Sequence, residues 1–237
     1  MAYSKIDMEV PDIERAYSNY SLPQVIAANT ATLKSIKSKY GLPISKWSLA
    51  FDIPSGIITA FIATESGGNQ FIVNKSFPDI KGLMQIAPAP VFDTVTRWKS
   101  EVSQPLPNEF ISEVRLKIPE LLKSGVKYDN NLKAKIVKLT ASDANFNIMM
   151  GTAHLRWLLE RFSTILGGGQ LNKAMVAYNA GAYTKALKTS GGGADITPVD
   201  TAVLVANKQV PLESRNYLLK MFGIDGFLFL IYKKKVI

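Results

Sequence analysis

The 237-residue sequence contains no cysteine and only one histidine, His154. Without cysteine the chain has no disulfide frame, no thiol nucleophile and no thiolate metal site. A single histidine argues against a zinc site built from several histidines, and also against a serine triad. The unbroken apolar run from Phe227 to Tyr232 is far shorter than the roughly 20 residues that a membrane-spanning helix needs. The chemistry must therefore come from other residue types.

Acidic residues are scarce relative to basic ones, 19 against 28, which gives a formal net charge of +9. Such a charge favours an anionic partner: a cell-wall polymer, nucleic acid or an acidic protein. The basic residues are scattered and form no recognisable nucleic-acid-binding motif, so nucleic acid is not a predicted partner. Residues 1–11 carry Lys5, Asp7 and Glu9 and lack the apolar core of a secretory signal, so no signal peptide is expected there.

The most informative stretch runs from Ile53 to Ile86, with Glu65 at its centre. Ile58, Phe61 and Ile62 have the i, i+3, i+4 spacing of one helix face, and Glu65 falls at i+7 on the same face. The residues expected to bound this helix are Asp52 as its cap, Pro54 in its first turn and Gly67-Gly68 at its end.

A carboxylate on that face meets apolar surroundings and the negative end of the helix dipole. Both disfavour its charge and raise its pKa, as a general acid working near neutral pH requires. The alternative is that Glu65 points into solvent at a frayed helix end.

Four sequence blocks follow one another along the chain: Glu65 to Asn69, Lys81 to Pro88, Ala177 to Gly181, and Glu213 to Tyr217. In this order they resemble the soluble lytic transglycosylase family of lysozyme-like enzymes, over about Ile44 to Phe222. The resemblance implies a mainly α, goose-type lysozyme-like fold with an N-terminal helical extension and a basic insertion. The expected units are 1–43 as the extension, 44–222 as the transglycosylase domain with its insertion at 92–140, and 223–237 as an apolar and basic tail.

The resemblance also implies a site. Glu65 would be the catalytic residue, supported by the Tyr178 hydroxyl, which would hydrogen-bond it, and by Tyr217 near the glutamate and the substrate. The family often has a serine nine residues after the glutamate, where this chain has Asn74, and Gly82 would let backbone approach a sugar. The predicted substrate-binding residues are Ser66, Asn74, Met84, Gln85, Asn179, Ala180 and Glu213. His154 is expected to be a packed helix residue.

The implied reaction is cleavage of the β-1,4 bond between N-acetylmuramic acid and N-acetylglucosamine in peptidoglycan, without metal or cofactor. Glu65 would act as acid and then as base, closing a 1,6-anhydro ring. A hydrolytic lysozyme is the nearest alternative, but it normally needs a second carboxylate, for which Asp79 is the main candidate. A structural virion or secretion-apparatus protein with a vestigial lysozyme fold is the alternative from another class. Because no signal peptide is expected, delivery to the cell wall by a phage particle or lysis programme is predicted, and virion or other envelope-penetrating proteins are possible partners.

The remaining segments carry weaker predictions. An insertion near the glycan could extend the groove, act as a lid or dock to a larger assembly. The tail is expected to be a buried strand or packing segment, with membrane-surface contact as the alternative. The predicted helices are Asn19 to Tyr40 ending at Gly41, Asn108 to Leu122 interrupted near Pro119, Leu132 to Leu139, Asp143 to Phe162, and Leu171 to Tyr178. The predicted irregular segments are a loop at Pro105 and Pro107, a flexible break at Gly167-Gly168-Gly169, and a mobile loop from Gly191 to Pro211.

Overall fold

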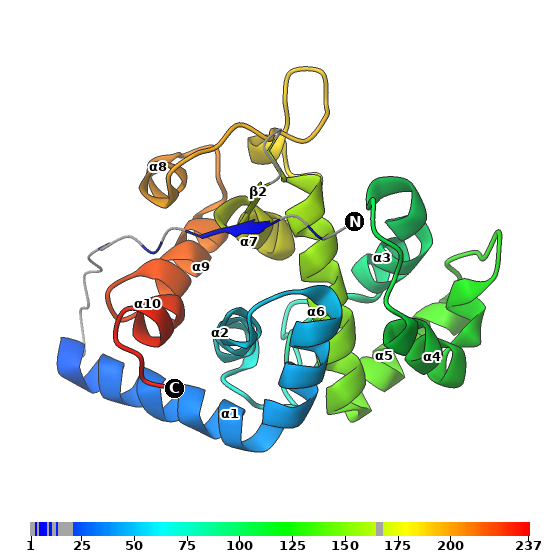
Figure 1. Cartoon of the computed structure of the whole chain (residues 1–237), viewed down its shortest axis with the longest axis horizontal. Helices are drawn as coiled ribbons and strands as arrows, with labels where there is room; N and C mark the ends of the chain where they lie inside the picture. The colour runs from blue at the N-terminus through cyan, green and yellow to red at the C-terminus, as the bar shows by residue number, and fades with distance from the viewer. Residues whose placement is uncertain (1–2, 4, 9, 11–12, 14–20, 165–167) are drawn as a thin grey trace.

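The computed structural model describes residues 3, 5–8, 10, 13, 21–164 and 168–237. Within them the chain is mainly helical, as predicted, with one short two-stranded sheet (Figure 1). The α-helices are α1 Leu22–Phe51, α2 Ser55–Ser66, α3 Pro88–Glu101, α4 Asn108–Lys117, α5 Asn130–Ser142, α6 Ala144–Arg161, α7 Leu171–Ala180, α8 Thr201–Ala206, α9 Leu212–Phe222 and α10 Phe227–Tyr232. The other elements are the 3-10 helices η1 Pro119–Leu122 and η2 Lys185–Leu187 and the strands β1 Lys5–Asp7 and β2 Gly168–Gln170.

Helix α2, which carries Glu65, is the central helix of the core and packs against α1, α9 and α10 (Figure 1). Every residue from Ile57 to Thr64 is buried, so the helix is enclosed all round and not along a single stripe. It ends where Gly67 adopts φ 62°, as the sequence predicts. Its start differs from prediction, because Asp52 caps the end of α1 and Pro54 precedes the first turn of α2.

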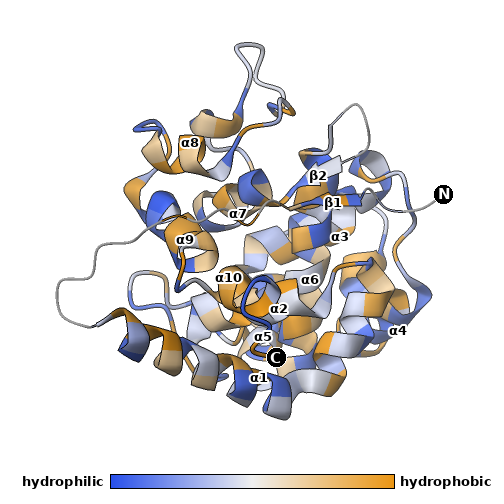
Figure 2. Cartoon of the chain, turned by 60° about the vertical axis from the view of Figure 1, so that its left-hand side comes forward, coloured by the Kyte–Doolittle hydropathy of each residue, from blue (hydrophilic) through white to orange (hydrophobic). Residues whose placement is uncertain are grey.

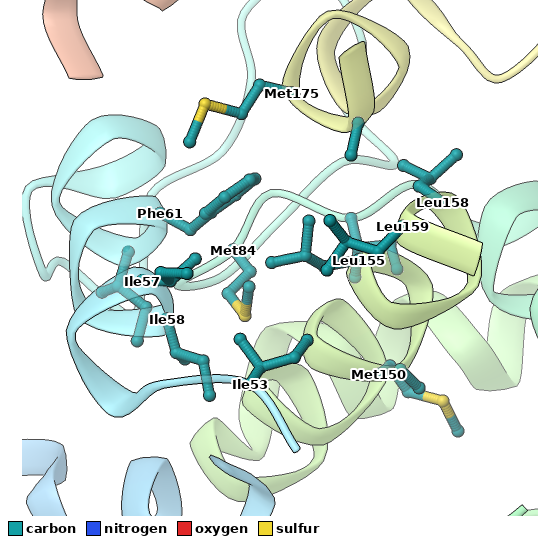
Figure 3. Packing of buried hydrophobic residues seen from close by; sticks show 14 of the residues in the cluster. Ile53, Ile57, Ile58, Phe61, Met84, Met150, Leu155, Leu158, Leu159 and Met175 are labelled. Atoms are coloured by element: carbon teal, nitrogen blue, oxygen red, sulfur yellow. The ribbon is translucent and has the colours of Figure 1, made fainter. Parts of the chain in front are cut away.

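The core is built from aliphatic, aromatic and methionine side chains that meet between α2 and α6. Figure 3 shows Met84 lying between Ile58 of α2 and Leu155 of α6. Both of these neighbours and Met84 itself are fully shielded from solvent. The core therefore fixes both the helix that carries Glu65 and the segment that follows it.

Helix α1 is 30 residues long and passes through Gly41 and Pro43, where the sequence predicts an end. The predicted boundary between residues 43 and 44 therefore falls inside a continuous helix. A proline in a helix interior costs about 3 kcal/mol, but beyond it Trp47 and Phe51 are completely buried. Burying two such aromatic side chains contributes about 3–6 kcal/mol, which offsets the local cost. Asn19 and Tyr20, where the predicted helix begins, lie outside the described residues.

The sides of α1 differ in polarity, as Figure 2 shows. Leu33 and Ile36 face the core, while Lys34 and Lys37 are exposed. This is the pattern of a helix that covers a core with one face and meets water with the other.

The predicted insertion of 92–140 forms a helical group beside α6 (Figure 1). Prediction missed α3, which begins at Pro88, because its two early prolines resemble loop residues although proline is tolerated in a first helical turn. The interruption at Pro119 separates α4 from η1, as predicted. Asp129 caps α5 by accepting a hydrogen bond from the Leu132 amide at 2.8 Å.

The α6 prediction is confirmed, and its cap is Asp143, which accepts from the Phe146 amide at 2.9 Å. The break predicted at three glycines is partly wrong. Gly167 lies outside the described residues, but Gly168–Gln170 is strand β2 and pairs in parallel with β1. A side chain at Gly169 would meet the Leu159 carbonyl at 3.0 Å, so glycine lets this strand pass close to α6.

The C-terminal part contains more structure than predicted. The region expected to be a loop from Gly191 to Pro211 includes α8, and the apolar run that follows α9 is the short helix α10, not a strand. Residues Phe227 to Ile231 are buried, which confirms the predicted packing role. Their side chains therefore do not face a membrane surface. In the part of the chain that the structure describes, no helix is long and apolar enough to cross a membrane.

Candidate active site

Glu65 lies in the last turn of α2, where α9 crosses it. The Tyr217 hydroxyl of α9 donates a hydrogen bond to Glu65 Oε1 at 2.8 Å. Phe61, one turn earlier on α2, makes edge contacts with the rings of Tyr217 and Tyr178, at centroid distances of 6.2 and 5.1 Å. The carboxylate thus sits against aromatic rings, with one oxygen held by a hydroxyl. The side chain still keeps partial contact with solvent.

The surroundings of Glu65 favour its protonated form. Burial is the largest influence and raises the pKa of Glu65 to about 7 from an ordinary value of 4.5. The Tyr217 hydrogen bond and the Lys220 ammonium oppose this increase, while the nearby charge of Glu213 adds to it. A carboxylic acid with this pKa can release and recover a proton near neutral pH.

Tyr178 does not make the hydrogen bond that the resemblance implies. Its hydroxyl donates to the Met84 carbonyl at 2.9 Å, so Tyr217 is the tyrosine bonded to Glu65. Burial and the charge of Glu65 raise the pKa of both phenols well above the ordinary value. Both hydroxyls therefore stay protonated as donors, one holding the acid and the other holding the backbone beside it.

Met84 and Gly82 are core residues, which corrects the predicted position of the Met84 side chain in or near the cleft. The Met84 side chain is fully buried, and its amide donates to Asn147 Oδ1 at 2.8 Å. At Gly82, with φ 85°, a side chain would come within 2.3 Å of the Asn147 amide nitrogen and 2.4 Å of the Thr140 carbonyl. Glycine is needed there because α5 and α6 approach closely, and the approach of this backbone to a sugar stays a prediction.

The polar side chains Ser66, Asn74 and Gln85 organise the backbone around the end of α2. Ser66 Oγ donates to the Ile62 carbonyl at 3.0 Å. Asn74 Oδ1 accepts from the amides of residues 76 and 77, each at 3.0 Å. Gln85, at φ 44°, donates from Nε2 to the Gly82 carbonyl at 2.8 Å. Asn74 and Gln85 remain partly exposed, whereas Ser66 is buried, so substrate contact remains a prediction for all three.

The two later blocks meet at the junction of α7 and α9. Ser214 Oγ donates to Asn179 Oδ1 at 2.7 Å, which orients the Asn179 amide, while Ala180 ends α7 and is partly exposed. Glu213 is exposed in the first turn of α9, one turn before Tyr217. This junction places Asn179 and Glu213 on the same side of the fold as the Tyr217 hydrogen bond.

Sequence reasoning missed Lys220. Lys220 Nζ donates to the Thr64 carbonyl at 2.7 Å, and its charge acts on the neighbouring Glu65. The signal was present, because Lys220 lies seven residues after Glu213 and three after Tyr217, on one helix face. Asn147-Ile148 resembles the family's helix that supports the active site, and Asn147 ties α6 to the backbone of Lys81 and Met84, although local spacing does not predict those partners.

The other acids considered from sequence have different partners. Asp79 Oδ2 lies 2.6 Å from Lys133 Nζ, and Asp52 ends α1. The carboxylate whose charge acts on Glu65 is that of Glu213. His154 is buried, as predicted, with Nδ1 2.8 Å from Thr94 Oγ1, and burial lowers its pKa to about 3.

The sequence matches the model of a known protein family. The sequence model of the transglycosylase SLT domain family matches residues 43–110 and 129–195, more than half of the chain. Glu65, Gln85 and Tyr178 lie within the match, whereas Tyr217 lies beyond it. The unmatched residues 111–128 lie inside the predicted insertion of 92–140. No curated protein sequence matches the chain. The helical fold and the extent of this match establish that the chain belongs to the transglycosylase SLT domain family.

Proposed function

We propose that the protein is a lytic transglycosylase that cleaves the β-1,4 bond between N-acetylmuramic acid and N-acetylglucosamine, with Glu65 as its single acid and base. Family membership supports the reaction class, peptidoglycan cleavage of the lytic transglycosylase type. The observation that carries the finer proposal is the environment of Glu65: burial raises its pKa to about 7, and Tyr217 holds one oxygen.

In the first step Glu65 donates its proton to the glycosidic oxygen as the bond from that oxygen to C1 of muramic acid breaks. The N-acetyl group of the substrate steadies the positive charge at C1. The Glu65 carboxylate then removes the proton of the muramoyl 6-hydroxyl, whose oxygen attacks C1. Glu65 regains its proton, no water is consumed, and the product ends in a 1,6-anhydro ring.

The Tyr217 hydroxyl would keep Glu65 oriented through both steps, because the carboxyl must be held in the geometry in which its proton can reach the glycosidic oxygen. Lys220 would favour the carboxylate that forms after the first proton transfer. The Tyr217 hydroxyl does not have to gain or lose a proton, since its pKa is raised well above the ordinary value.

The test compares the turnover of wild type and Glu65→Gln on purified sacculi and identifies the product that wild type forms. Glutamine has the same size but cannot donate a proton, so turnover should fall at least about a hundredfold in a folded protein. Mass spectrometry of wild-type digests should show 1,6-anhydromuramoyl ends, each lighter by one water than the hydrolytic product. Reducing muramic acid ends as the main product would establish a hydrolytic lysozyme instead, and substantial turnover by Glu65→Gln would remove Glu65 from the mechanism.

A further inference from the structure

A surface groove of about 630 Å³ lies where the loop before the Gln85 turn faces α5, and none of the steps above uses it. Ala134 and Val137 of α5 contribute its apolar part. The charged side chains along it are Lys81 and Asp79 from the loop and Lys133 and Lys138 from α5. The groove therefore combines a small-residue apolar surface with a predominantly basic lining.

The groove and the predicted sugar-binding residues share one loop of the backbone. Lys81 pairs with Val73 in an antiparallel bridge, and this pairing closes the loop that carries Asn74. The Lys81 carbonyl accepts a hydrogen bond from Asn147 Nδ2 at 2.9 Å, just before the turn that carries Gln85. A ligand in the groove would thus contact the same loop whose residues are predicted to contact the sugar.

The lysines differ in their availability to a ligand. Lys133 is paired with Asp79 at 2.6 Å, so its charge is already balanced by a carboxylate of the protein. Lys81 and Lys138 form no ion pair with any of the residues that the structure describes. The ammonium groups of Lys81 and Lys138 are therefore available to an anionic ligand beside the apolar surface of α5.

We propose that this groove binds the stem peptide of a peptidoglycan strand, an anionic peptide with small apolar side chains. Its alanine methyl groups fit the surface of Ala134 and Val137, and its carboxylates complement Lys81 and Lys138. The inference rests on the proposed function, since it takes peptidoglycan as the substrate. It assigns to the loop a second role, in which one side faces the sugars and the other holds the peptide attached to them.

The experiment compares two substrates: glycan strands with their stem peptides, and the same strands stripped of peptide by an amidase. Lys81→Glu/Lys138→Glu should raise KM for peptide-bearing strands about three- to tenfold, because two exposed lysine–carboxylate contacts are lost. Its kcat, and its KM for stripped strands, should match wild type. Lys34→Glu/Lys39→Glu, an equal charge change at exposed positions of α1, is the matched control and should leave the ratio of the two KM values unchanged.

Binding of a synthetic alanine–glutamate stem tetrapeptide separates this inference from the proposed function. In NMR spectra of the full-length protein, the peptide should shift the methyl signals of Ala134 and Val137, and the double variant should weaken that effect. A protein inactive on both polymers that still binds the peptide would support the groove while refuting the enzyme. An active protein whose two KM values respond equally in the groove variant and the control would overturn the groove and leave the enzyme standing.

Discussion

Glu65→Gln should make the protein more stable above pH 7, although it removes the proposed catalytic acid. In the folded protein the Glu65 carboxyl keeps its proton up to about pH 7, whereas its ordinary pKa is 4.5. Between these values the folded state binds a proton that the unfolded chain has released, so the free energy of unfolding decreases as pH rises. Glutamine is neutral at every pH, and its side-chain oxygen can still accept the Tyr217 hydrogen bond.

The size of the effect follows from the pKa difference. Each pKa unit corresponds to about 1.4 kcal/mol, so the difference from 4.5 to about 7 gives an upper value of about 3.5 kcal/mol. Because the side chain keeps partial solvent contact, we expect about 2–3 kcal/mol. The gain should be absent below pH 4.5, grow between pH 4.5 and 7, and stay constant above. At pH 8 it corresponds to an increase in Tm of about 4–12 °C for a chain of this length.

Urea unfolding of wild type and Glu65→Gln across pH 4 to 8.5 measures the difference in their free energies of unfolding. Effects of pH on other groups are common to both proteins and cancel in this difference. Glu109→Gln provides the matched control, because it makes the same change at an exposed position of α4 and should alter stability by less than about 1 kcal/mol. If Glu65→Gln has the same stability relative to wild type at every pH, or is less stable at pH 8, the argument that burial raises the Glu65 pKa is wrong.

Three further variants test the contacts around the site. Tyr217→Phe removes a hydrogen bond that lowers the Glu65 pKa, so the alkaline limb of the activity profile should move to higher pH and kcat should fall about tenfold; an unmoved limb would contradict this. Tyr178→Phe leaves the Met84 carbonyl without its donor, so chemical denaturation should show a loss of about 1–3 kcal/mol without a shift of that limb. Gly82→Ala introduces a side chain within 2.4 Å of neighbouring atoms at a positive φ, and a loss of less than about 1 kcal/mol by the same assay would refute the crowding.

Local signals predicted the position of Glu65 well. The spacing of Ile58 and Phe61 predicts that α2 is a helix, and Gly67 ends it because its left-handed conformation suits glycine. The cap at Asp143 is a signal of the same kind, since its partner is only three residues away. Each of these features depends on residues within about two helical turns of one another, which is the range that a sequence pattern describes.

Tertiary contacts decided the features that the sequence could not predict. Both Tyr178 and Tyr217 are near Glu65, and only the docking of α7 and α9 determines which hydroxyl reaches its carboxylate. The helix continues through Pro43 because distant elements bury Trp47, a stabilisation that no local propensity contains. The buried side chain of Met84 follows in the same way from its packing between α2 and α6.

The contact between α2 and α10 has a consequence for the order of events during synthesis. A side chain at Gly56 would lie 2.9 Å from the Tyr232 hydroxyl, so the first turn of the helix that carries Glu65 is completed by a segment 176 residues later. Domains fold as units while the chain leaves the ribosome. The nascent protein therefore reaches its final α2 packing only after α10 has emerged. A ribosome-bound chain stalled before Phe227 should leave α2 accessible to protease, and release of the next few residues should protect it.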